Sequence, residues 1–246
     1  MFVKEELITD QERMLFDAPI PSRTRTYTPI SHEEMIRRTK EYLADSGYKI
    51  SATDYIISND LQVMTGKYEL DFGSSEIKMQ LALQNSYNKK VSAKNIFGGK
   101  VDICSNGMYW GEYPFVGKHT GDIDRRFFES LQETIHNSRS KFEELLSYAD
   151  ALKGVTLSRR ATDSLFGQLF RDKKLFTDSQ FLNFRQEYFR KVPKYDYGVE
   201  GKNNMWNLYN LATGAIEMRS NSSNYIQTHL NISDLIHRIL EGETGA

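Results

Sequence analysis

The sequence contains little of the chemistry from which catalytic and metal sites are usually built. Its single cysteine, Cys104, excludes both a disulfide framework and a cysteine-based zinc site within one chain. The segment Gly98-Gly99-Lys100-Val101 lacks the Lys-Ser or Lys-Thr ending of a phosphate-binding loop and leads into an expected strand. There is also no dinucleotide-binding fingerprint and no G-x-S-x-G motif. We therefore expect no cofactor.

The sequence also lacks a strong net charge and long apolar runs. A net charge of −1 argues against a protein that coats nucleic acid through bulk charge. No apolar run approaches the roughly 20 residues that a membrane helix needs. The first segment, MFVKEELITDQERMLF, has early acids and no apolar run of signal length. Together with the lone cysteine, which suits a reducing compartment, these features predict a cytoplasmic protein that has no membrane partner.

The first 30 residues predict an extended, irregular arm. The stretch APIPSRTRTYTPI has three prolines and no helical period. Such an arm either packs along another subunit or stays mobile. After Pro29, the three-residue spacing of Ser31 and Glu34 is that of a capping box, which predicts a helix that ends near Gly47.

Apolar and polar residues alternate over 67–72 and 77–84. This period of two predicts strands with one buried face and one wet face. We expect further strands at 90–97, 101–104 and 108–113, a turn at 85–88, and a turn or bulge at 98–99. The segment as a whole predicts an antiparallel meander.

Beyond His119-Thr120-Gly121 the apolar spacing changes to 3.6 residues. The pattern predicts one helix of nearly thirty residues from Ile123. Later helices are expected at 158–171, 178–191, 203–218 and 232–241. Because strands come first and helices follow, we predict an α+β fold, in which an N-terminal helix and a meander precede a long helix and a helical C-terminal half. We divide the chain into an arm (1–30), an α+β core (31–152) and a helical region packed on that core (153–246).

Positive charge is concentrated in two segments. Residues 77–101 carry five lysines and no acid, and residues 159–194 carry nine basic and four acidic side chains. Lysines on the wet face of a sheet can contact phosphates, and an exposed tyrosine can stack on an unpaired base. We predict a surface for single-stranded DNA made of Lys78, Tyr87, Lys89, Lys90, Lys94, Lys100, Arg125 and Arg126.

An ordinary structural interpretation of both segments stays open. A run of one charge sign also arises by chance on a solvated surface. The phenylalanines of the second segment stand at helical spacings, so we expect them in the core; they are Phe166, Phe170, Phe176, Phe181, Phe184 and Phe189.

A third candidate site surrounds His119. This histidine stands in a predicted loop, and Asp122 and Asp124 follow it. The three side chains suit a metal-dependent enzyme, but acids at a helix start also complement the helix dipole. We favour the second explanation and predict no catalytic or metal-binding residue. Cys104 has apolar strand neighbours and no evident histidine partner in the sequence, so we expect a small core hydrophobe.

Four segments resemble the motifs of domain of unknown function 932. They are NSYNKK (85–90), GKVDICSNGM (99–108), KHTG (118–121) and NMWNLYNLAT (204–213). The chain departs from the family pattern at Lys89, where the turn has glycine, and at Leu211, where alanine is usual. The resemblance implies a protein of phages, prophages or plasmids that works in a bacterial cytoplasm, and it implies no mechanism. The order of elements is also similar to that of the Rad52-type annealing proteins, which form rings around single strands.

Three hypotheses about function follow. The first is a phage- or plasmid-type accessory protein that binds single-stranded DNA as a homo-oligomer, without catalysis, in replication or recombination, annealing included. The second is a non-enzymatic interaction protein, in counter-defence or in the virion, with a host or phage protein as its partner; the arm and the acidic flanks favour it. The third is a metal-dependent enzyme acting on nucleotides or nucleic acid through His119, Asp122 and Asp124. We take the first as the working hypothesis.

Overall fold

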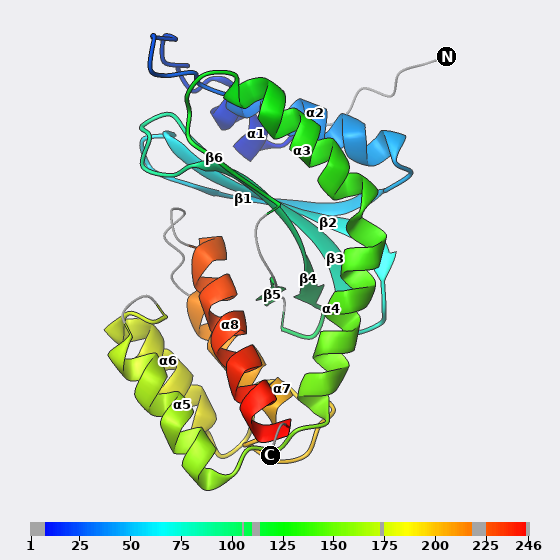
Figure 1. Ribbon diagram of the computed structural model, residues 1–246, viewed down its shortest axis with the longest axis vertical. Coiled ribbons are helices and arrows are strands. Elements are labelled where there is room, and N and C mark those ends of the chain that lie inside the picture. The colour runs from blue at the N-terminus through cyan, green and yellow to red at the C-terminus, as the bar shows by residue number, and fades with distance from the viewer. Residues whose placement is uncertain (1–7, 105, 110–113, 173–174, 218–224, 245–246) are drawn as a thin grey trace.

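The computed structural model describes residues 8–104, 106–109, 114–172, 175–217 and 225–244. These residues form an antiparallel sheet with helices on both of its faces (Figure 1). The strands precede most of the helices in the chain, so the α+β prediction is confirmed. Among the described residues, no helix combines the length and the apolar character needed to span a bilayer.

The sheet is a meander in which sequence neighbours pair. Its main strands are β1 (Ile50–Ile57), β2 (Val63–Gly73), β3 (Ile77–Ser86), β4 (Ala93–Val101) and β5 (Gly107–Met108). A further strand, β6 (Phe115–Gly117), also pairs with β4. In the centre Leu81 lies opposite Tyr68 on one side and Phe97 on the other, which places apolar side chains together on one face.

Three helices cover that apolar face: α1 (Asp10–Phe16), α2 (His32–Asp45) and α3 (Ile123–His136) (Figure 1). Helix α2 begins as predicted, because the Ser31 hydroxyl accepts a hydrogen bond from the Glu34 N–H at 3.3 Å. Its apolar stripe, which includes Met35, Ile36 and Leu43, is fully buried.

The remaining helices form the C-terminal half: α4 (Ser138–Lys153), α5 (Arg159–Arg171), α6 (Asp178–Tyr188), α7 (Met205–Glu217) and α8 (Tyr225–Thr244). Helices α7 and α8 lie on the other side of the sheet, and α5 and α6 form a hairpin farther out (Figure 1). The Ser233 hydroxyl of α8 donates to the Tyr109 carbonyl at 2.6 Å, and the Tyr109 hydroxyl donates to Gln80 of β3. These bonds tie the helical half to the sheet.

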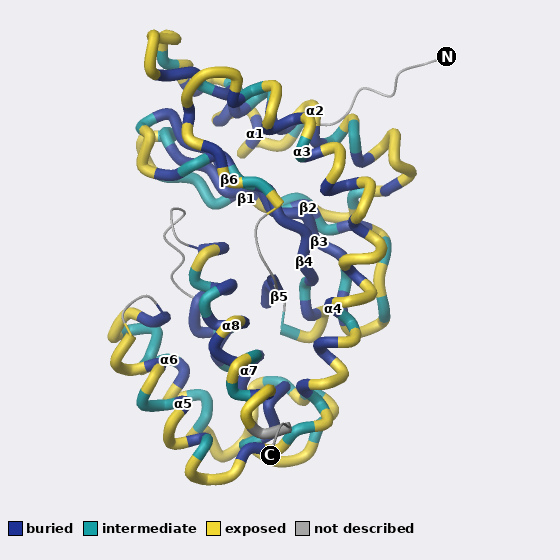
Figure 2. Tube along the Cα trace, viewed as in Figure 1, coloured by how far each residue is buried: buried dark blue, intermediate teal, exposed yellow. Residues whose placement is uncertain are grey.

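The polar face of the sheet is covered along β3, so our prediction of a wet face is wrong for that strand; on β2, Asp71 is exposed. Gln80 and Gln84 of β3 are only 6% and 1% exposed, and Figure 2 shows the central strands buried. The Gln84 amide donates to the Thr65 hydroxyl at 3.0 Å within this layer. Alternation separates the two faces of a strand, but it does not say what covers the polar one.

Several predicted boundaries are also wrong. Gly98 and Gly99 lie inside β4 and make no turn; a Cβ on Gly98 would stand 2.4 Å from the Met108 carbonyl oxygen, so glycine permits β5 to approach closely. The long helix is two helices, α3 and α4, which separate at Asn137 while the apolar spacing stays in phase. Of the strand expected at 108–113, residues 110–113 lie outside the described residues.

The N-terminal arm is not wholly irregular and it packs on its own chain. Helix α1 starts at a capping box made by Thr9 and Glu12. The prediction of an irregular arm relied on the prolines that follow this helix and did not use the capping box. Farther on, the Thr28 N–H donates to the His119 carbonyl at 2.9 Å, and the Tyr27 hydroxyl donates to the Tyr87 carbonyl at 2.8 Å. The arm therefore joins the β3–β4 turn to the loop before α3.

Candidate functional site

Burial and an ion pair limit what the lysines of the sheet offer to a ligand, although two of them lie side by side. Lys78 and Lys100 lie opposite each other on β3 and β4, and both are half-buried. The Lys100 ammonium is 2.5 Å from a Glu69 carboxylate oxygen. Lys94 is half-buried too, and burial lowers the pKa of its ammonium. A half-buried or ion-paired cation is less available to a phosphate than an exposed, unpaired one.

At the β3–β4 turn, Tyr87 is a core residue and cannot stack on a base. It is 3% exposed, its ring lies 3.9 Å from that of His32, and its hydroxyl accepts a hydrogen bond from the His32 N–H. Lys89 is exposed, but its ammonium lies 4.5 Å from the centre of the Tyr27 ring. Lys90 is exposed at the tip of the turn.

The two arginines of α3 are engaged with acids of the same helix end. Arg125 lies 2.5 Å from Asp122 and 2.9 Å from Glu129, and Arg126 lies 3.0 Å from Asp122. These arginine contacts lower the pKa of the Asp122 carboxyl. The cluster is a network of ion pairs on an exposed helix end.

His119 is 4% exposed, and burial lowers the pKa of its imidazole. It is thus a core residue behind Tyr27, with ring centres 6.0 Å apart, and not an open loop residue. Within the described part of the chain, no three His, Cys, Asp or Glu side chains gather as metal ligands. For the third hypothesis, the part of the chain that the structure describes holds no assembled metal site.

The second basic segment places cations and aromatic rings together on the outside of the molecule. Phe189 is 63% and Phe170 is 53% exposed, which contradicts the expectation that all of these phenylalanines are core. Phe176 and Phe184 are buried, and Phe166 and Phe181 are partly buried against the core. Residues 182, 185 and 189 follow the helical spacing on one side of α6. We define the α6 surface as Phe170, Leu182, Arg185, Phe189, Lys191 and Val192.

Cations on and beside the α6 surface are available. Arg185, Lys191 and Lys194 are exposed, and within the described residues no acidic side chain forms an ion pair with them. The Arg185 guanidinium lies 5.8 Å from the centre of the Phe189 ring. Lys173 and Lys174 of this segment lie outside the described residues.

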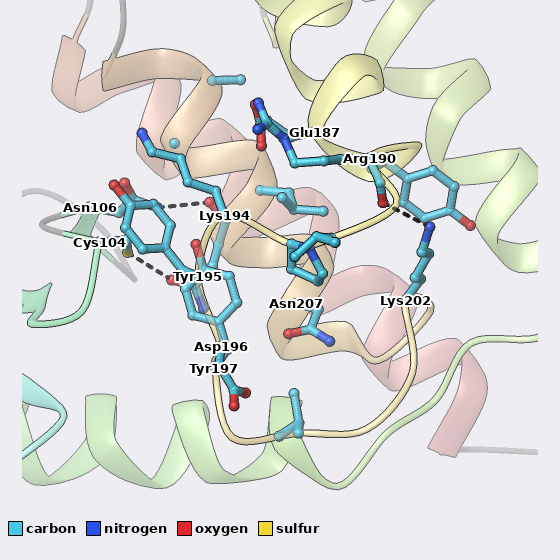
Figure 3. Close-up of a pocket in the computed structure, with 18 of the residues that line it drawn as sticks. Cys104, Asn106, Glu187, Arg190, Lys194, Tyr195, Asp196, Tyr197, Lys202 and Asn207 are labelled. Atoms are coloured by element: carbon cyan, nitrogen blue, oxygen red, sulfur yellow. Dashed lines mark hydrogen bonds and ion pairs between the residues drawn. The ribbon is translucent and has the colours of Figure 1, made fainter.

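A pocket of about 500 Å³ opens beside α6 (Figure 3). It is lined from the β4–β5 connection, from α6, from the segment 190–202 and from α7. Figure 3 shows Cys104 and Asn106 near Tyr195 and Tyr197 on one side, and Arg190 and Lys202 on the other. The volume lies within the range of about 300–1,000 Å³ that is typical of small-molecule sites.

The floor of the pocket joins two sequence motifs that lie a hundred residues apart. The Asn106 amide donates to the Asn210 carbonyl at 2.8 Å, and the Cys104 thiol donates to Asn210 Oδ1 at 3.8 Å. Gly214 gives Asn106 its space, since a Cβ there would stand 3.1 Å from Asn106 Nδ2. Cys104 is half-buried at the pocket wall rather than in the core.

The rim combines three cations with tyrosines. The Lys202 ammonium donates to the Arg190 carbonyl at 3.1 Å, and the Arg190 guanidinium lies 2.5 Å from Glu187. The Lys194 ammonium lies 4.9 Å from the centre of the Tyr195 ring. Burial raises the pKa of Tyr197, so its phenol stays neutral.

Sequence reasoning did not single out this pocket. Two of its three tyrosines come from the loop YDYGVEG and have no helical or strand period to mark them; the third, Tyr188, ends α6. The only available signal was the resemblance motifs 99–108 and 204–213, whose asparagines meet at the pocket floor.

Comparisons with known proteins identify a family and nothing closer. The model of a domain of unknown function, DUF932, matches residues 19–231 of the chain. No curated protein and no solved structure matches the chain significantly. The analogy with Rad52-type annealing proteins therefore has no support.

Proposed function

Since the chain belongs to the DUF932 family, whose description assigns no function, we propose from its surface chemistry that it binds single-stranded DNA without catalysing a reaction on it. We place this activity in a phage- or plasmid-type accessory role in replication or recombination, in a bacterial cytoplasm. The proposal keeps the ligand expected from the sequence and moves its binding surface from the sheet to the α6 surface.

The observation that carries the proposal is the exposure of aromatic rings beside unpaired cations. Apolar side chains that are exposed together often mark an interaction site, and Phe189 and Val192 are 63% and 76% exposed. Arg185 and Lys191 stand beside them and supply positive charge. Rings that stack on bases, next to cations that contact phosphates, are the usual components of a single-strand surface.

The same geometry favours a single strand over a duplex. In a duplex the base faces are stacked on each other, so exposed phenylalanines have nothing to stack on. In a single strand every base offers a face, whatever the sequence. A surface of this kind should therefore show little sequence preference.

The test measures the affinity for a fluorescent oligonucleotide by anisotropy, in the wild type and in two variants. Phe189→Ala removes a stacking ring and should cost about 1–3 kcal/mol, which is roughly 5- to 150-fold in affinity. Arg185→Gln removes a phosphate contact and should weaken binding less than Phe189→Ala does. Its effect should be smaller at high salt than at low salt. Light scattering on the same samples measures the mass, and thus whether a homo-oligomer forms.

Two matched controls separate the α6 surface from other parts of the protein. Ile20→Ala removes an apolar side chain that is 55% exposed in the arm, and Lys90→Gln removes an exposed cation of the β3–β4 turn. Both should bind as the wild type does. If Lys90→Gln weakened binding while Phe189→Ala did not, the binding surface would lie on the sheet and the proposal would fail. If no oligonucleotide bound at low salt, a protein partner for the α6 surface would become the better hypothesis.

A further inference from the structure

We infer that the pocket beside α6 binds one nucleoside monophosphate, a ligand that the α6 surface itself does not require. Within α6 the two sites use opposite sides of the helix, because Asn183 and Glu187 line the pocket whereas Leu182 and Phe189 are exposed. Val192, which follows the helix, belongs to both sites. Separate tests therefore use residues that belong to one site only.

The walls of the pocket suit a planar heterocycle. Tyr188, Tyr195 and Tyr197 line the pocket, and the last two have ring centres 6.1 Å apart. The Asn106 amide donates to the Asn210 carbonyl and the Asn207 amide donates to the Gly201 carbonyl, both at 2.8 Å. Each carboxamide keeps a second N–H and its oxygen. Carboxamides are the groups that pair with the edge of adenine.

The charges of the pocket suit one phosphate and a ribose. Arg190, Lys194 and Lys202 stand against two acids, Glu187 and Asp196, so the lining carries a net charge of about +1. This balance fits a monophosphate better than a triphosphate, whose extra charges would meet the acids. The Asp196 Oδ1 atom accepts the Gly198 N–H at 2.9 Å, and a carboxylate held in this way can accept a ribose hydroxyl.

The mononucleotide has two possible sources that share one chemistry: a free nucleotide and the end of a strand lying on the α6 surface. Calorimetric titration of the full chain with adenosine monophosphate, cytidine monophosphate and inorganic phosphate tests the free form. A short oligonucleotide with and without a terminal phosphate tests the strand end. We expect the adenine nucleotide to bind more tightly than the cytosine nucleotide, and inorganic phosphate to bind far more weakly than either.

Two pocket variants and two matched controls assign the site. Asn183→Ala and Lys194→Gln change pocket-lining groups, and each should weaken adenosine monophosphate binding by about 3- to 30-fold. Gln186→Ala, an exposed amide of α6 outside the pocket, and Lys118→Gln, an exposed cation of the loop before α3, should leave it unchanged. Circular dichroism of each variant verifies that it is folded.

The outcomes separate this inference from the proposed function. Nucleotide binding that Asn183→Ala weakens and Phe189→Ala leaves intact supports the pocket, even if oligonucleotides do not bind. If no nucleotide binds at millimolar concentration, or if inorganic phosphate binds as tightly as adenosine monophosphate, the inference is overturned, whatever the α6 surface does. Equal weakening by the pocket variants and by their controls would also overturn it.

Discussion

The buried histidine between α2 and the sheet makes stability depend on pH in a way that one substitution can isolate. His32 is fully buried, with its Nε2 3.3 Å from the Leu61 carbonyl oxygen and its Nδ1 3.0 Å from Asn85 Nδ2. Because Asn85 Nδ2 also donates to the Ile30 carbonyl at 2.8 Å, its orientation is fixed and His32 Nδ1 is the acceptor. The hydrogen bonds thus assign a neutral ring with its proton on Nε2.

Burial lowers the pKa of His32 from 6.5 to about 4, and the nearby His119 acts in the same direction. The unfolded chain therefore binds the proton more readily than the folded protein. Keeping His32 neutral therefore contributes to the free energy of unfolding. This contribution is fully present above the unfolded pKa and is lost as the pH falls from about 6.5 to about 4. A difference of about 2.5 in pKa corresponds to about 3 kcal/mol in total, of which about 2 kcal/mol is lost by about pH 5.

Urea denaturation of the wild type and of His32→Gln at about pH 7.5 and about pH 5 measures this pH-dependent part of the free energy of unfolding. The variant is expected to be less stable at the higher pH, since it loses the ring contacts with Tyr87. Its deficit should shrink by about 2 kcal/mol at the lower pH. His136→Gln, an exposed histidine at the end of α3, is the matched control and should follow the wild type. An equal deficit at both pH values would refute the reasoning.

Further predictions concern the arm and two glycines. Glu12 is fully buried, accepts the Tyr55 hydroxyl at 2.7 Å and lies 2.9 Å from Lys40, so Glu12→Ala should cost about 3–5 kcal/mol. A thermal midpoint equal to that of the wild type would contradict the docking of α1. Gly98→Ala should cost about 1–3 kcal/mol, because its Cβ meets a carbonyl oxygen of β5. The control is Gly167→Ala, since a Cβ at this position of α5 meets open space, and this variant should be more stable than the wild type by about 1 kcal/mol. Urea denaturation measures both variants. The opposite order of stability would show that β5 does not pack on Gly98.

The fold class was predictable because local patterns carry it. Ser31 and Glu34 mark the start of α2, and the alternation over 77–84 marks the centre of β3. The break at Asn137 was not predictable, since the apolar residues on its two sides keep one helical phase. The burial of the polar side of β3 by the C-terminal helices was also not predictable from the sequence. It depends on contacts between residues more than a hundred positions apart, such as the one between Ser233 and Tyr109.

The candidate site was predicted less well than the fold, for a physical reason. A count of lysines says nothing of their partners, and Glu69 neutralises Lys100 across the sheet. Conversely, helical spacing made Phe189 resemble a core residue, although its ring only borders Phe166 and Tyr188 and is 63% exposed. Only the tertiary structure shows which cations are available and which aromatic rings stay outside.

The most direct test of the central claim is the salt dependence of single-strand binding. Each phosphate contact contributes a slope of about −0.7 to the logarithm of affinity against the logarithm of salt concentration. The double variant Arg185→Gln/Lys191→Gln should therefore show a slope that is less steep by about 1.4 than the wild-type slope. An unchanged slope in this variant, or a wild-type protein that fails to bind at low salt, would contradict the account.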